Sequence, residues 1–167
     1  MATQQGSLAL LDDPVAQKLL QSTLPARLAY NWSDGTPRVV PIWFHWNGKE
    51  IVLGTFPAAP KMKVLKDGTK VAVTIDSDSM PYKVLMIRGS VHIDTVEGIS
   101  PEYRASAQRV LGEEQGQAFT NQVQPIMTRT SRIFIRPEWV AIQDFETRFP
   151  NAMERAMERA AGAGARE

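Results

Sequence analysis

Two hairpin signals constrain the fold of this chain more than any other feature. Asp34–Gly35 and Asn47–Gly48 each stand between stretches rich in apolar and β-branched residues, and such dipeptides favour tight turns between antiparallel strands. The sequence therefore predicts three consecutive strands, over 27–32, 38–46 and 50–55. Strands joined this closely do not fit a parallel sheet, which needs long crossovers. Pro41 cannot donate to a sheet ladder, so we expect it at an edge or a bulge.

Alternating patterns predict further strands downstream. A strand over 70–76 places Val71, Val73 and Ile75 on one face, and a long strand over 82–94 alternates cleanly. The last β segment covers 130–135, and 139–145 either continues it past a bulge at Pro137 or forms a separate strand. With six or seven strands in one domain, closure into a barrel would protect the sheet edges.

Cap and proline signals predict short helices around the strands. Asp13–Pro14 and Ser100–Pro101 each combine an N-cap residue with proline at the first helical position. The segments 60–65 and 113–123 are also predicted to be helical. The repeated Met-Glu-Arg of 151–161 predicts a C-terminal helix with solvated Glu/Arg pairs. We expect residues 1–7 to be loose, and we divide the chain into a domain over 1–150 and a helix with a disordered tail over 151–167.

Composition excludes several classes of function. The 167 residues contain no cysteine, which rules out disulfides, thiolate metal sites and a cysteine nucleophile, and only two histidines, so a metal site is not expected. The net charge of +1 provides no general attraction for nucleic acid or a membrane. No apolar run approaches membrane-spanning length and no signal peptide is recognisable, so we expect a cytoplasmic protein.

The lysines are concentrated in one short segment. Gly54–Thr55–Phe56 ends the third predicted strand, and after a proline-rich turn Lys61, Lys63, Lys66 and Lys70 follow within ten residues. Cations at the start of a helix oppose its dipole. Backbone N–H groups, a threonine hydroxyl and two ammonium groups would together suit a bound phosphate. The alternative interpretation is a solvated, charged surface.

The order of elements from Ala26 to Val91 resembles the pyridoxamine 5'-phosphate oxidase-like split-barrel flavoproteins, especially the branch with small FMN proteins and deazaflavin-dependent reductases. The resemblance lies in ARLAY, DGTPRVVPIWFHWNG, IVLGTF, PKMKVLKDGTKVAV and YKVLMIRGSVHI. It implies a mainly β (β+α) fold: a six-stranded antiparallel split barrel with short flanking helices, forming a homodimer with cofactors in the two grooves between subunits.

The resemblance also implies roles for particular residues. Thr55, Lys61 and Lys63 match the positions that hold the phosphate end of the cofactor. Val40, Pro41 and Ile42 match the strand whose main chain follows the isoalloxazine ring, and Trp139 matches an aromatic residue contributed by the other subunit. Ala59–Pro60–Lys61 replaces Ser–Arg–Lys of the vitamin oxidases and Ile135–Arg136–Pro137 replaces their substrate-phosphate motif, so vitamin oxidase activity is not expected.

Three functions remain as hypotheses. The favoured one is an oxidoreductase that transfers hydride between FMN, or the deazaflavin coenzyme F-420, and a small organic substrate; no catalytic side chain is identified, because the cofactor carries the chemistry. The second is a non-catalytic flavin- or haem-related binding or sensor protein. The third is an oligonucleotide-binding barrel, which the charge disfavours.

Several side chains stay without an assigned ligand. Trp43 and Trp46 are expected in the core or a dimer interface, and His45 and His92 are expected to be structural. Three arginines also stay open: Arg88, Arg132 and Arg136. Each could contact the cofactor, the substrate or neither of them.

Overall fold

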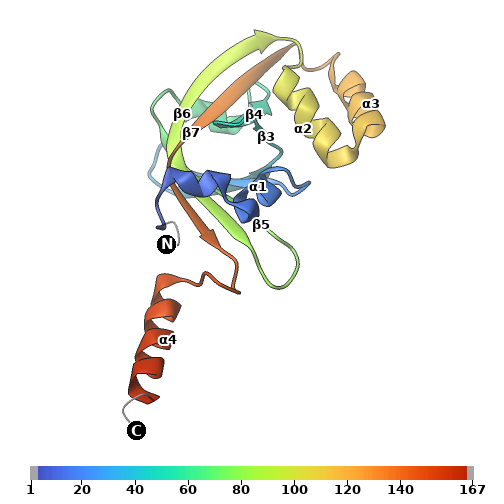
Figure 1. The fold of residues 1–167 in the computed structure, drawn as a ribbon. Coiled ribbons are helices and arrows are strands. Elements are labelled where there is room, and N and C mark those ends of the chain that lie inside the picture. The colour runs from blue at the N-terminus through green and yellow to red at the C-terminus, as the bar shows by residue number, and fades with distance from the viewer. Residues whose placement is uncertain (1–3, 165–167) are drawn as a thin grey trace.

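A curved antiparallel sheet forms the body of the protein in the computed structural model, which describes residues 4–164 (Figure 1). Its strands are β1 (Ala26–Asn31), β2 (Pro37–Ile42), β3 (His45–Trp46), β4 (Ile51–Thr55), β5 (Lys70–Asp76), β6 (Val84–Glu97) and β7 (Arg129–Gln143). The α-helices are α1 (Pro14–Leu20), α2 (Pro101–Leu111), α3 (Glu113–Val123) and α4 (Asn151–Gly164), and the short 3-10 helices are η1 (Leu8–Asp12) and η2 (Pro60–Lys63).

The two edges of the sheet are consecutive in the sequence. The strand order is β2-β1-β5-β6-β7-β4-β3, and only Trp43 and Phe44 separate β2 from β3. The sheet must therefore curl until its edges approach each other, which gives the split barrel that was expected. The side chain of Phe44 is fully buried at this junction.

This junction corrects the predicted course and pairing of the strand over 38–46. The segment 38–46 was expected to be one strand, but it is divided into β2, which pairs with β1, and β3, which pairs with β4. The sheet within residues 4–164 has seven strands, which agrees with the six or seven predicted from the sequence pattern and is one more than the six that the resemblance implied. The predicted helix over 60–65 is also shorter and tighter, because only Pro60–Lys63 forms a 3-10 turn.

β6 and β7 form a long antiparallel pair. Their register shifts between Arg88 and Gly89, where Gly89 lies opposite Pro137. A Cβ on Gly89 would come within 2.1 Å of the Arg136 carbonyl oxygen, so this close approach requires glycine. The bulge expected at Pro137 is present, and β7 continues past it as a single strand.

Alternation places one face of each strand in the core. Leu28, Val73, Ile87 and Ile133 are each at most 1% exposed, as expected from their spacing. The N-terminal segment is more ordered than expected: the Gln5 side chain and the Gly6 N–H bond the main chain of β7. Because these contacts satisfy β7 backbone groups, residues 4–7 are held on the barrel; residues 1–3 lie outside the described part.

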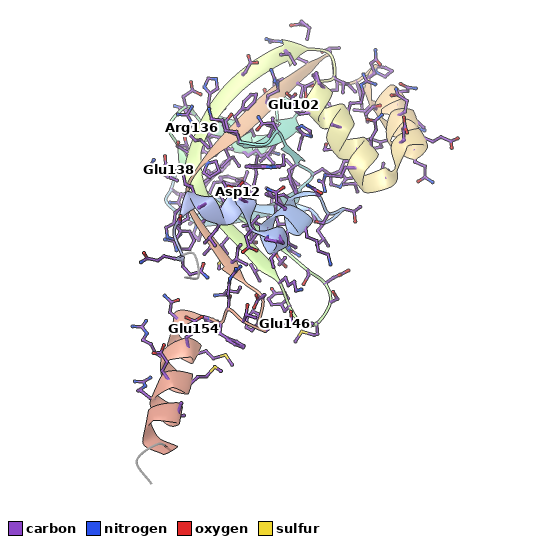
Figure 2. The ribbon with its side chains drawn as sticks, viewed as in Figure 1. Asp12, Glu102, Arg136, Glu138, Glu146 and Glu154 are labelled. Atoms are coloured by element: carbon purple, nitrogen blue, oxygen red, sulfur yellow. The ribbon has the colours of Figure 1, made fainter. Side chains whose placement is uncertain are left out.

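The helices α2 and α3 form a hairpin at one end of the barrel, whereas α4 stands apart from it (Figure 1). Arg132 on β7 fastens α2, because its guanidinium donates to both carboxylate oxygens of Glu102, at 3.1 and 2.5 Å, and to Asp94 on β6 at 2.9 Å. Figure 2 labels Glu102, which lies in the first turn of α2. Helix α4 begins at Asn151, as the sequence predicted, but it continues to Gly164 instead of ending near residue 161. The expectation that the last residues, 161–167, fray is therefore wrong for 161–164, and residues 165–167 lie outside the described part.

Candidate functional site

A cavity of about 540 Å³ lies between the barrel and the α2–α3 hairpin, a volume typical of small-molecule sites. Its lining comes from the ends of β2 and β4, the segment after β4, and the helical hairpin. The lining residues are Pro25, Pro41, Ile42, Trp43, Gly54, Thr55, Phe56, Lys61, Tyr103, Ser106, Phe119 and Met127. Four of the seven residues that the sequence predicted as cofactor-binding are therefore brought together here.

Lys61 is the one lining side chain with a full charge. It is half-buried, and burial alone lowers the pKa of its ammonium group, since no carboxylate opposes that effect. Among residues 4–164 no acidic side chain pairs with Lys61 within 4.0 Å, whereas Lys70 in the same stretch pairs with Glu138 at 2.7 Å. A half-buried cation without a counter-ion favours an anion bound in the cavity.

Thr55 stands beside this cation because β4 ends there. The strand is held by pairing with β7, where Thr55 lies opposite Ser131, and its side chain is only 7% exposed. Pro57 and Pro60 then prevent the strand from continuing, and η2 turns Lys61 back toward the cavity. A hydroxyl and an ammonium group thus both line the cavity.

β2 supplies a second wall. Pro41 and Ile42 line the cavity, while Val40 lies opposite Leu28 and packs against the core. β2 is the last strand on its side of the sheet, so within residues 4–164 its outer edge has no ladder partner. Main-chain groups of this edge are consequently free to bond a planar ligand, although Pro41 itself offers only its carbonyl.

The third wall is aromatic and was not identified from the sequence. Tyr103 and Phe119 are stacked with ring centroids 6.5 Å apart, and Trp43 meets Phe119 edge-on at 5.3 Å. Tyr103 packs directly on β4, where a Cβ on Gly54 would lie 2.8 Å from its Cδ2 atom. A glycine inside an otherwise apolar strand was the signal for this close approach. Trp43 therefore lines the cavity rather than the core.

Trp139 and Lys63 are not part of this cavity. Trp139 pairs with Arg88 in the β6–β7 ladder, and the guanidinium carbon of Arg88 lies 4.0 Å from the centre of the indole ring. Arg88 and Trp139 line a separate cavity of about 330 Å³ near Gln5. Lys63 is exposed on η2 and does not line the main cavity. Within one chain, neither residue lies on the lining that Lys61 and Thr55 share.

The other open positions have structural partners. Arg132 is held by Glu102 and Asp94, as described above, and Arg136 lies 3.6 Å from Glu50. His45 is half-buried, and burial lowers its pKa. His92 is exposed and lies 3.3 Å from Asp67. Neither histidine lines the main cavity.

The titratable groups that line the main cavity are the ammonium group of Lys61 and the phenol of Tyr103. No carboxylate or imidazole is among its lining residues, and no cluster of three potential metal ligands occurs within residues 4–164. No helix in the same part of the chain is long and apolar enough to cross a bilayer.

No known protein-family model matches the chain, and no curated protein sequence does. Solved structures with the same fold exist. One titled "F420 Reductase" has 24% identity and a TM-score of 0.51, with 77% of this chain and 95% of that chain covered. The FAD and heme binding protein from Mycobacterium smegmatis has 18% identity and a TM-score of 0.56, with 92% and 78% covered.

A third similar structure carries the family name in its description. It is a protein from Clostridium acetobutylicum related to general stress protein 26 and assigned to the pyridoxinephosphate oxidase family, with 16% identity, a TM-score of 0.52, and 81% and 88% of the two chains covered. Likeness at such low identity concerns the fold rather than the activity. The chain has the fold of the pyridoxamine 5'-phosphate oxidase-like split-barrel proteins.

Proposed function

We propose that this protein is a flavin-dependent oxidoreductase that binds FMN in the cavity beside Lys61. The observation that carries the proposal is a half-buried ammonium group without a carboxylate partner, at one end of a cavity of about 540 Å³. A phosphate carries close to two negative charges at neutral pH. It would supply the missing counter-charge, and the apolar remainder of the cavity suits a planar ring.

Each wall has a distinct task in this proposal. Lys61 donates to the phosphate and Thr55 adds a hydroxyl hydrogen bond. The free edge of β2 around Ile42 bonds the polar rim of the ring, which fixes its orientation. Tyr103 and Phe119 exclude water from the opposite side. Lys63, being exposed, contributes to the attraction of the anion rather than to direct contact.

The bound flavin would supply hydride transfer, and the protein would supply binding, orientation and exclusion of water. The lining lacks a carboxylate or imidazole that could act as a general acid or base. This composition favours transfer to small apolar or aromatic substrates, because such molecules fit against Trp43, Phe119 and Met127.

A second copy of the chain would complete the site. Phe56 lines the cavity and is 39% exposed, and Val39 on the free edge strand is 65% exposed. Burial of such groups favours association. In a homodimer, Trp139 of the second copy would approach the cofactor.

FMN is favoured over the deazaflavin coenzyme F-420, whose anionic tail needs further cations. Arg132, one candidate for that tail, is already engaged by Glu102 and Asp94, and Arg136 lies beside Glu50. One structure of the same fold is nevertheless titled "F420 Reductase", so both cofactors belong in the test.

The test is a titration of the purified protein with FMN, riboflavin and the deazaflavin, followed by fluorescence and absorbance. We expect saturable binding of FMN with quenching of its fluorescence, and reduction of the bound flavin by NADH or NADPH that a small substrate then reverses. Binding without any turnover would indicate the non-catalytic alternative, a flavin carrier or sensor. Absence of binding to either phosphorylated cofactor would overturn the proposal.

A further inference from the structure

Lys61 differs from every other lysine of the chain in its surroundings. All seven lysines lie within residues 4–164. The exposed ones are Lys18, Lys49, Lys63, Lys66 and Lys70. Lys83 is part-buried, but its ammonium group lies 3.5 Å from the Glu146 carboxylate. Among the described residues, Lys61 is thus the one lysine that is withdrawn from solvent without an acidic side chain within 4.0 Å.

The environment of Lys61 weakens the charged form of its amine. Burial lowers the pKa of the ammonium group, and no neighbouring charge opposes that effect. The other titratable group in the cavity lining is the Tyr103 phenol. Burial raises the pKa of Tyr103, so the phenol stays neutral and adds no negative charge to the lining. Lys61 is therefore a neutral, nucleophilic amine more often than a lysine in open water is.

The rest of the cavity suits a small, flat, apolar molecule. Trp43, Tyr103 and Phe119 line it with aromatic rings that contact one another, and Met127 adds further apolar surface. At about 540 Å³ the cavity has room for an aromatic ring with a short substituent. A molecule of this kind would share the cavity with the Lys61 amine.

A neutral amine in an apolar cavity can react with a carbonyl group. The Lys61 nitrogen forms a bond to the carbonyl carbon while the carbon–oxygen double bond opens, and one proton passes from nitrogen to oxygen. The new hydroxyl then leaves with the second hydrogen of the nitrogen as water, and a carbon–nitrogen double bond remains. No oxidant or reductant is consumed, and water reverses the reaction. Desolvated lysines are used in this way to form Schiff bases with carbonyl compounds.

We propose that Lys61 captures small aromatic aldehydes as a Schiff base when the cavity holds no anion. The aromatic walls bind the ring, and the half-buried amine supplies the nucleophile. A ligand with a carboxylate or phosphate would instead pair with the ammonium form of Lys61 and keep it unreactive. The inference therefore goes beyond the proposed flavin chemistry and concerns the protein without a bound phosphate.

Reductive trapping tests this proposal on the full-length protein without flavin. Benzaldehyde is added in a buffer that contains neither phosphate nor a primary amine, and sodium cyanoborohydride reduces any Schiff base to a stable benzyl-lysine. Peptide mass spectrometry then gives the labelling rate at each of the seven lysines. We expect Lys61 to be labelled at least about tenfold faster than any exposed lysine, because the cavity brings the aldehyde and the amine together.

The dependence on aldehyde concentration separates a binding site from general reactivity. Labelling of Lys61 should saturate as benzaldehyde fills the cavity, whereas labelling of the exposed Lys66 should rise in proportion to the concentration. Equal rates at Lys61 and Lys66 would overturn the proposal, and so would a rate at Lys61 that does not saturate. These measurements use the wild-type chain, so they do not depend on the folding of a variant.

A change in the aromatic wall provides a second readout. Phe119→Leu removes the ring that contacts both Trp43 and Tyr103, and it should raise the half-saturating benzaldehyde concentration several-fold. Phe149→Leu is the matched control, because Phe149 is also part-buried but lines the separate cavity near Gln5; it should leave this concentration unchanged. Equal effects of the two variants would show that the aromatic wall does not hold the aldehyde, and the proposal would fail. Failure of FMN to bind would leave all of these outcomes unchanged, because no arm contains flavin.

Discussion

Replacement of Lys61 by methionine is the sharpest test of the proposed cofactor site. Methionine keeps most of the length and apolar character of the lysine stem, so the packing of η2 against the barrel should persist. The variant removes one positive charge from the cavity, in which no carboxylate compensates it. Protein stability should therefore change little or rise slightly, because a desolvated cation is lost.

The expected loss of affinity follows from the number of contacts that disappear. One charge-assisted hydrogen bond contributes about 1.5–3 kcal/mol. Since about 1.4 kcal/mol corresponds to a tenfold change in affinity, FMN should bind Lys61→Met about 10- to 150-fold more weakly. Riboflavin has the same ring without the phosphate, so its affinity should be almost unaffected. The difference between the two ligands isolates the interaction of Lys61 with phosphate.

Fluorescence titration of both ligands against wild type and Lys61→Met gives the four affinities needed. Lys66→Met is the matched control, because Lys66 is an exposed lysine in the same segment that does not line the cavity; it should change FMN affinity little. Equal weakening of FMN and riboflavin by Lys61→Met would refute the phosphate role. Equal effects of Lys61→Met and Lys66→Met would show that only the general charge of the segment matters.

The remaining predictions concern the same site and its supports. Because burial lowers the pKa of Lys61 below its ordinary 10.5, FMN affinity should begin to fall at a lower alkaline pH than riboflavin affinity, and parallel curves would contradict this. Gly54→Ala places a Cβ 2.8 Å from the Tyr103 ring and should destabilise the fold by about 1–3 kcal/mol through overpacking. Gly162→Ala should not destabilise it, because no atom lies within 4 Å of the added Cβ. The free energies of unfolding of both variants are compared by chemical denaturation. Glu102→Gln leaves Arg132 with Asp94 alone and should lower the free energy of unfolding by about 1–3 kcal/mol, which corresponds to several degrees of melting temperature. Glu97→Gln, at an exposed ion pair, should have little effect. Equal melting temperatures of the two variants would show that Arg132 does not fasten α2. Burial alone would raise the pKa of Asp144, but hydrogen bonds from the Thr147 hydroxyl and from backbone N–H groups hold this pKa far below 3.8. The resulting stabilisation of the fold is complete above about pH 4 and is lost as the pH falls through the lowered pKa. The stability advantage of wild type over Asp144→Asn should therefore shrink on acidification, and a constant difference in urea unfolding between pH 7 and pH 3 would contradict this assignment.

These predictions separate the cation at the site from the groups that hold its walls in place. Among flavins, Lys61 should affect only those with a phosphate. Glu102 and Gly54 should act through the position of α2, and so through the aromatic wall. A change in riboflavin affinity in Glu102→Gln, without a specific effect on FMN, would fit this division, because Tyr103 lies one residue from Glu102.

The elements that depend on local rules were predictable from the sequence. The Asp34–Gly35 turn, the Ser100 cap and the alternation of Val71, Val73 and Ile75 each follow from a few neighbouring residues. Thr55 and Lys61 are separated only by a short proline-rich turn, so their common place in the cavity lining is a local feature as well. The resemblance to split-barrel proteins added the prediction that Pro41 and Ile42 lie along a cofactor ring, and both line the cavity.

Other features depended on contacts between residues far apart in the sequence. The periodicity of 38–46 gives no sign that its two halves pair with strands on opposite edges, since that division results from closure of the sheet. Tyr103 and Phe119 have the spacing of ordinary core residues, and only the placement of α2 over Gly54 turns them toward the cavity. Arg132 looked available for a ligand until β6 and α2 brought two carboxylates to it.

The sequence by itself determined the antiparallel strands, most helix ends and the cation beside Thr55, because turns, caps and side-chain alternation act over a few residues. The tertiary structure alone decided which walls enclose that cation, which arginines are already paired, and that α4 stands free of the barrel. These outcomes depend on how a curved sheet brings distant segments together, and no short stretch of sequence contains that information.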